Sequence, residues 1–85
     1  MRGYEVRFTR EAVKDIGKLS PKLKVKLREV LAEAVASNPQ AGKRLVGDLK
    51  GFHSVRLTLK DRIVYTIDEN ARTVIVHRAR THYGE

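Results

Sequence analysis

The stretch FHSVRLTLKDRIVYTIDENARTVIVHRAR (residues 52–80) decides the fold, because it holds three runs of strand length separated by short turns. Apolar and polar side chains alternate in residues 52–59, and β-branched residues dominate residues 62–68 and 72–80. The turns KD and ENA leave room only for tight reversals. Such short connections predict an antiparallel meander of three strands.

The first half of the sequence predicts one more strand and two helices. YEVRFT (residues 4–9) alternates like a half-buried strand, and Thr9 is a typical N-cap for the helix behind it. Ser20 followed by Pro21 starts a second helix, which should end near Ser37.

Residues 38–51 are expected to be a loop, so the predicted order is β-α-α-β-β-β in one domain, residues 1–85. This is an α+β fold: a small antiparallel sheet with the two N-terminal helices packed on one face. The first strand is expected at the edge of the sheet, and the other face is expected to stay open.

The composition limits the kind of partner. The chain of 85 residues has a formal net charge of +8, and residues 1–42 and 43–85 each carry nine basic and five acidic groups. An excess spread over the whole chain favours a polyanion or an acidic protein as partner, although a merely basic surface would give the same count. No cysteine and no close pair of histidines are present, so we expect no metal and no cofactor. No apolar run is long enough for a signal peptide or a membrane span, and the expected location is the cytoplasm.

Arginines in the predicted meander share one face. Arg56 alternates with the apolar side chains of its strand, Arg62 begins the next strand, and Arg78 and Arg80 lie two residues apart on the last. His82 continues this register. Cross-strand neighbours lie about 5 Å apart, so the sequence predicts a patch of Arg56, Arg62, Arg80 and His82, unless these are ordinary solvated side chains.

Such a patch suits the cleavage of RNA. Arginines match phosphate oxygens and stabilise the extra negative charge that develops when a 2′-hydroxyl attacks the neighbouring phosphorus. His82 has a pKa suited to protonating the leaving oxygen, and Tyr83 could stack on a base. Nucleic acid could also contact the basic start of the second helix. The RNA-binding residues that we predict are Lys22, Lys24, Lys26, Lys50, Arg78 and Arg80.

The motif L-x-G-x-x-S-x-R-x-x-x-x-x-R-x-V-Y is present as Leu49, Gly51, Ser54, Arg56, Arg62, Val64 and Tyr65. Together with the ending RARTHYGE and the opening YEVRFTREAVKDIGKL, it resembles the RelE/ParE toxins of type II toxin–antitoxin systems, with the YoeB/Txe and RelE branches most similar. The resemblance implies a microbial RNase-like fold and an endoribonuclease that cuts mRNA in the ribosomal A site. It implies an acidic antitoxin as partner, besides mRNA and the ribosome, and no membrane.

The resemblance also implies roles for single residues. Arg56 and Arg62 match family arginines that bind phosphate and stabilise the transition state, and His82 and Tyr83 match a terminal pair in which the histidine is the general acid. Lys43 falls where YoeB-like toxins carry a glutamate general base, so the identity of the base stays open, with Lys43 the candidate. Two alternatives remain: a ParE-like inhibitor of DNA gyrase without nuclease activity, and a non-catalytic RNA-binding module.

Overall fold

The computed structural model describes residues 3–81, and for Arg80 and Thr81 it describes the backbone only. The elements follow one another as β1 (Glu5–Phe8), α1 (Arg10–Gly17), α2 (Pro21–Val30), the π-helical η1 (Leu31–Val35), the 3₁₀ turn η2 (Pro39–Ala41), β2 (Lys43–Arg44), the 3₁₀ turn η3 (Gly47–Leu49), β3 (His53–Arg56), β4 (Asp61–Asp68) and β5 (Thr73–Thr81). The predicted α+β class and the predicted order of helices and main strands are confirmed.

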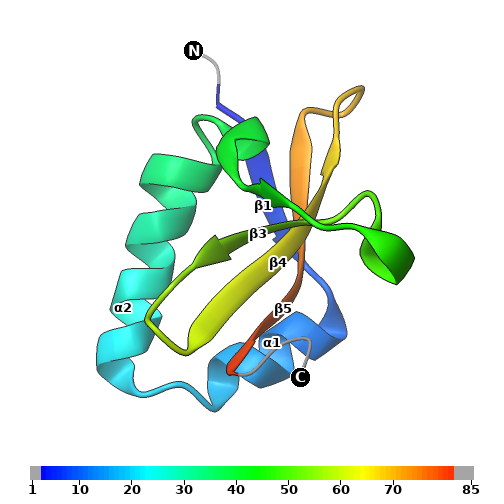
Figure 1. Ribbon diagram of the computed structural model, residues 1–85. Helices are drawn as coiled ribbons and strands as arrows, with labels where there is room; N and C mark the ends of the chain where they lie inside the picture. The colour runs from blue at the N-terminus through cyan, green and yellow to red at the C-terminus, as the bar shows by residue number, and fades with distance from the viewer. Residues whose placement is uncertain (1–2, 82–85) are drawn as a thin grey trace.

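The strands form one sheet in the order β1-β5-β4-β3-β2 (Figure 1). β3, β4 and β5 make the antiparallel meander that the short turns predicted. β1 lies at the edge, as expected, but it runs parallel to β5, with Glu5 opposite Thr73, so the sheet is mixed. Both helices and the strands β2, β3 and β4 separate β1 from its partner in sequence, so no tight turn imposes an antiparallel direction.

Side-chain caps start both helices at the residues that the sequence indicated. The Thr9 hydroxyl accepts a hydrogen bond from the Ala12 N–H at 3.1 Å, and the Ser20 hydroxyl accepts one from the Leu23 N–H at 3.3 Å. α2 then passes directly into η1, so that the helical segment ends close to its expected end. Each cap satisfies a backbone donor that has no partner within the helix.

Two segments differ from the expectation. Residues 38–51 are not a plain loop, because Lys43 and Arg44 pair with β3 as the short strand β2. β3 ends at Arg56 rather than near Leu59, whose side chain is 87% exposed in the turn. The Thr58 hydroxyl closes this turn early, because it accepts hydrogen bonds from the N–H groups of residues 60 and 61.

The hydrophobic core lies between the helices and one face of the sheet. Its buried residues are Ala12, Leu27, Leu31, Val35, Leu57, Ile63, Tyr65, Val74, Val76 and Ala79. Along β4, Ile63 and Tyr65 face this core, so Arg62 and Val64 face the opposite side. The candidate functional groups of the meander therefore lie on the side of the sheet away from α2.

Candidate functional site

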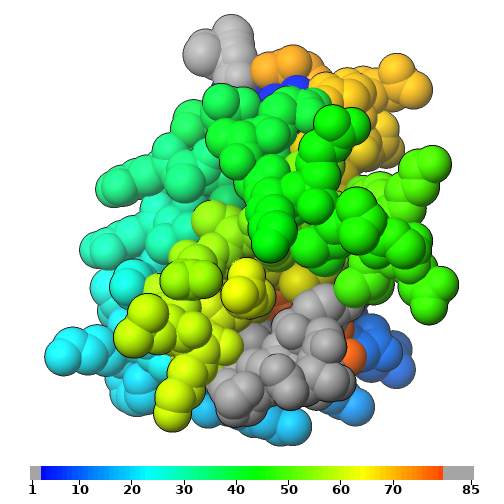
Figure 2. Space-filling view, viewed as in Figure 1, coloured from blue at the N-terminus to red at the C-terminus, as the bar shows by residue number. Residues whose placement is uncertain are grey.

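Three arginines stand opposite one another on three neighbouring strands. Arg56 of β3 pairs with Arg62 of β4, and Arg62 pairs with Arg80 of β5. Arg56 is exposed and Arg62 is half-buried, and neither forms an ion pair within the described part of the chain. We call these three residues the arginine row. The surface of β3, β4 and the turn between them faces the reader in Figure 2, with segment 43–52 beside it.

A hydrogen-bonded turn holds Arg56 and Arg62 in register. The Thr58 hydroxyl donates to the carboxylate of Asp61 at 2.8 Å, and the Leu57 N–H donates to the Asp61 carbonyl at 2.8 Å. Asp61 is 7% exposed. These contacts fix the two strand ends on either side of the turn, and with them the first two members of the arginine row. The sequence analysis did not single out Thr58 or Asp61, although threonine and aspartate side chains often form hydrogen bonds with the backbone in turns.

Lys43 lies close to the arginine row. It pairs with Ser54, which stands two residues before Arg56 on the same face of β3. Diagonal neighbours of this kind have Cα atoms about 7–8 Å apart, within reach of a lysine side chain.

The residues before Lys43 are fixed by Tyr65, which belongs to the core and is 1% exposed. Its hydroxyl donates to the Pro39 carbonyl at 2.7 Å, and burial raises the pKa of Tyr65. A Cβ atom on Gly42 would lie 2.1 Å from the same hydroxyl, so only glycine fits beside it. This packing fixes where Lys43 enters β2.

The predicted terminal pair, His82 and Tyr83, lies outside the described residues. β5 ends at Thr81, whose backbone pairs with Asp61 next to the arginine row. The catalytic roles of His82 and Tyr83 stay predictions.

The side chain of Arg78 is bound to α1, although Arg78 lies only two residues from Arg80 on β5. Its guanidinium donates to the carboxylate of Asp15 in α1 through Nε at 2.8 Å and through Nη2 at 3.1 Å. The Ala79 N–H donates to the same carboxylate at 3.1 Å. The side chain of Asp15 is 8% exposed, so this pair ties α1 to β5 and gives Arg78 a structural function.

The predicted RNA-binding lysines are dispersed. Lys50 follows η3 and lines a hollow of about 520 Å³ with Phe52 and His53. Lys22 and Lys26 are exposed on α2, and Lys24 is half-buried there. Because α2 covers the core side of the sheet, these three lysines are not brought together with the arginine row.

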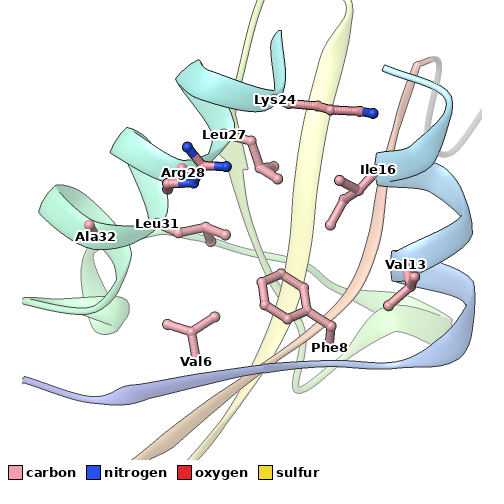
Figure 3. Close-up of a pocket in the computed structure, with 9 residues that line it drawn as sticks. All are labelled: Val6, Phe8, Val13, Ile16, Lys24, Leu27, Arg28, Leu31 and Ala32. Carbon is pink, nitrogen blue, oxygen red and sulfur yellow. The ribbon is translucent and has the colours of Figure 1, made fainter. Parts of the chain in front are cut away.

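A groove of about 480 Å³ lies between β1, α1 and α2 (Figure 3). Its residues are Val6, Phe8, Val13, Ile16, Lys24, Leu27, Arg28, Leu31 and Ala32. Phe8 is 43% exposed and Val13 is 58% exposed, so apolar side chains are left open to solvent here. Lys24 and Arg28 add positive charge at the side of α2. Such a surface fits an amphipathic, acidic protein segment.

In the described residues, no group of three histidine, cysteine, aspartate or glutamate side chains could hold a metal ion. None of the helices within residues 3–81 combines the length and the apolar character that a membrane crossing needs.

Comparison with known proteins places the whole chain in one group. A profile described as the ParE-like toxin of type II bacterial toxin–antitoxin systems matches residues 6–83. The putative toxin RelE4 of Methanocaldococcus jannaschii is 35% identical over 74 residues, which cover 85% of this chain and 79% of that protein.

Solved structures give the same result. The toxin–antitoxin complex RelBE2 from Mycobacterium tuberculosis contains a chain with a TM-score of 0.87 and 32% identity, and the match covers 96% of this chain and 94% of that one. The YoeB/ParE toxin from Agrobacterium tumefaciens has a TM-score of 0.80 at 24% identity, with 93% of this chain and 99% of that chain covered. This second likeness shows the fold alone.

Proposed function

The chain belongs to the ParE-like family, within the RelE/ParE superfamily, and is a toxin of a type II toxin–antitoxin system; we propose that it is an endoribonuclease that cleaves mRNA on the ribosome, in the cytoplasm. The observation that supports this most is the arginine row. Like charges placed directly across a sheet destabilise it, so their alignment needs a compensating anion. The phosphorane that forms when a 2′-oxygen attacks a phosphodiester is such an anion, because it carries extra negative charge.

In the proposed reaction, the 2′-oxygen of one nucleotide attacks the adjacent phosphorus and gives its proton to a base. Arg56 and Arg62 neutralise the phosphorane, and the bond to the 5′-oxygen then breaks. That oxygen takes a proton from His82, which leaves a 2′,3′-cyclic phosphate and a 5′-hydroxyl. Tyr83 orients the nucleotide. Lys43 is the candidate base on the strength of its place beside Ser54, diagonal to Arg56.

The proposal is tested by primer extension on mRNA that is being translated in a reconstituted system. Wild type should produce new 5′ ends within codons, and Arg62→Ala should lower the cleavage rate at least a hundredfold, since removal of one transition-state donor has that order of effect. Arg7→Ala is the matched control, because Arg7 is an exposed arginine on β1 that pairs only with Glu5 among the described residues. Unchanged cleavage by Arg62→Ala would refute the assignment.

A ParE-like inhibitor of DNA gyrase is the second candidate, favoured by the description of the matching family. It predicts growth arrest without any new 5′ ends in mRNA, together with loss of supercoiling activity by purified gyrase. Wild-type protein and the Arg62→Ala variant, tested in both assays, separate the two functions.

For the partner, we propose that an acidic amphipathic segment of the cognate antitoxin occupies the groove between β1, α1 and α2. Several similar structures are toxin–antitoxin complexes, such as the intact RelBE complex of E. coli. Two features of this chain support the groove as the place of contact: the exposed apolar side chains Phe8 and Val13, and the positive charges of Lys24 and Arg28 beside them. Apolar contact would supply affinity, and charge would supply steering.

A further inference from the structure

A second group of side chains lies on the same face of the sheet as the arginine row, the face away from α2. The Thr66 hydroxyl and the Nε2 atom of His77 are hydrogen-bonded at 2.9 Å. The rings of Phe52 and His77 meet edge to face, with centroids 5.0 Å apart and planes at 64°. All three residues are half-buried, so each keeps part of its surface exposed to solvent.

A β-bulge places His77 in this group. Val64 pairs with Arg78, whereas the next residue, Tyr65, pairs with Val76, so His77 is the extra residue of β5. The Thr9 hydroxyl donates to the His77 carbonyl at 3.2 Å and so helps to hold the bulge. Bulges redirect side chains and are frequent beside active sites. Here the bulge brings an aromatic ring to the face of the sheet that carries the arginine row.

The position fits a strand that also reaches the arginine row. Thr66 lies four residues after Arg62 on β4 and on the same face, which corresponds to about 13 Å along the strand. Phe52 lies on the β3 side of Thr66, and His77 lies on the β5 side. Phe52 also lines the hollow that contains Arg44 and Lys50, whose charges would attract the neighbouring phosphates. An RNA that crosses the arginine row can therefore continue over Thr66 with one of its bases against the two rings.

The chemistry favours a base rather than a phosphate at this position. Burial lowers the pKa of His77, so its ring is neutral at pH 7 and does not attract an anion. Two rings at a steep angle form a corner in which one ring stacks on a base and the other contacts its edge. Single-stranded RNA is recognised in proteins mainly by stacking of this kind.

From these contacts we infer that Phe52, Thr66 and His77 bind a nucleobase of the mRNA next to the nucleotide that is cleaved. The inference rests on the proposed nuclease function and extends it, because it names the residues that hold the strand outside the reacting centre. These are positioning residues, so they should affect the choice of cleavage position and the affinity for RNA more than the chemical step.

The first test uses the cleavage map of translated mRNA. Phe52→Leu keeps an apolar side chain but removes the ring, and His77→Gln removes the second ring while leaving a hydrogen-bonding group for Thr66. Each variant should lose about tenfold in the rate at subsaturating mRNA and should change the base preference beside the cut, which is the order of loss found when a stacking aromatic is removed. Tyr4→Leu is the matched control, since it removes a half-buried ring at the far end of the sheet. Its map should equal that of wild type.

The second test does not depend on cleavage or on the folding of a variant. Wild-type protein is added to ribosomes programmed with mRNA whose A-site codon carries 2′-O-methyl groups, which block the attack, and one 5-iodouridine, which cross-links to stacked aromatic side chains under light. We expect a cross-link in the peptide that contains Phe52 or the one that contains His77. One outcome would refute the base site but not the nuclease function. In it, wild type cleaves mRNA, its cross-links lie in other peptides, and Phe52→Leu and His77→Gln cleave with wild-type rate and base preference. If wild type neither cleaves nor cross-links, both are wrong.

Discussion

Removing the carboxylate of Asp15 should cost a large part of the stability of this protein. Among its contacts with described residues, Asp15 accepts two hydrogen bonds from the guanidinium of Arg78 and one from the Ala79 N–H. Breaking a buried ion pair by deleting one partner typically costs about 3–5 kcal/mol. The side chain of Arg78 is 32% exposed, so water can solvate part of its charge, and we expect the lower end, about 3 kcal/mol, for Asp15→Ala.

That loss is large beside the total stability of a domain of this size, about 4–13 kcal/mol. It corresponds to a fall in melting temperature of about 12–24 °C. Urea unfolding followed by circular dichroism measures the free energy, and calorimetry measures the melting temperature. Asp15→Asn is the matched variant: it keeps an oxygen for the Ala79 N–H and should lose about half as much.

A double-mutant cycle decides whether the two residues act as a pair. Arg78→Met alone should destabilise the protein, and adding it to Asp15→Ala should cost little more, because the interaction is already lost. An Asp15→Ala protein within 0.5 kcal/mol of wild type would refute this reasoning. The same variants test whether Arg78 binds RNA. If Arg78→Met binds RNA more weakly than wild type while Asp15→Asn binds it normally, Arg78 contacts RNA directly. If both variants bind RNA more weakly, the lost ion pair explains the effect.

Three further outcomes follow from the geometry. Gly42→Ala should lower the free energy of unfolding by about 1–3 kcal/mol in urea denaturation, because its Cβ would meet the Tyr65 hydroxyl. Gly17→Ala is the control and should not lower it, because no atom lies within 4 Å of the added Cβ. Equal stability of the two variants would contradict the packing argument. Burial lowers the pKa of His53 and of His77 below 6.5, so the unfolded chain takes up protons first and stability should fall as pH drops below about 6.5, with no change above it. Urea midpoints from pH 7.5 to 5.5 measure that slope, and replacing either histidine by glutamine should reduce it. Val13→Asp should weaken antitoxin binding at least tenfold in calorimetry, because it places a carboxylate in the apolar groove between β1, α1 and α2. Val25→Asp changes an exposed valine outside that groove and should bind the antitoxin normally.

Local rules predicted the parts of the fold that local contacts determine. Thr9 and Ser20 cap helices because their hydroxyls reach N–H groups three residues away, and the alternation around Ile63 and Tyr65 places them in the core. The direction of β1 and the existence of β2 depend on partners far away in sequence. A strand of two residues such as Lys43–Arg44 has no periodicity to detect.

In the candidate site, too, local patterns predicted some features, and contacts between residues far apart in sequence determined the others. The alternation of β3 and the start of β4 were enough to align Arg56 with Arg62. By contrast, Arg78 lies 63 residues from the carboxylate that binds it, and no local pattern indicates that contact. The bulge at His77 was hidden for a related reason, because RTVIVHRAR reads as one regular strand and the extra residue is visible only against the register of β4.

The arginine row has a cost that the rest of the fold must offset. Like charges directly opposite one another on paired strands destabilise a sheet by about 0.2–1 kcal/mol for each pair. Within the described residues, neither Arg56 nor Arg62 forms an ion pair with a carboxylate, and Asp61 accepts a hydrogen bond from Thr58 in the turn between the two strands. A carboxylate opposite Arg62 would relieve this repulsion, and we expect the scissile phosphate of the proposed reaction to supply negative charge at this place.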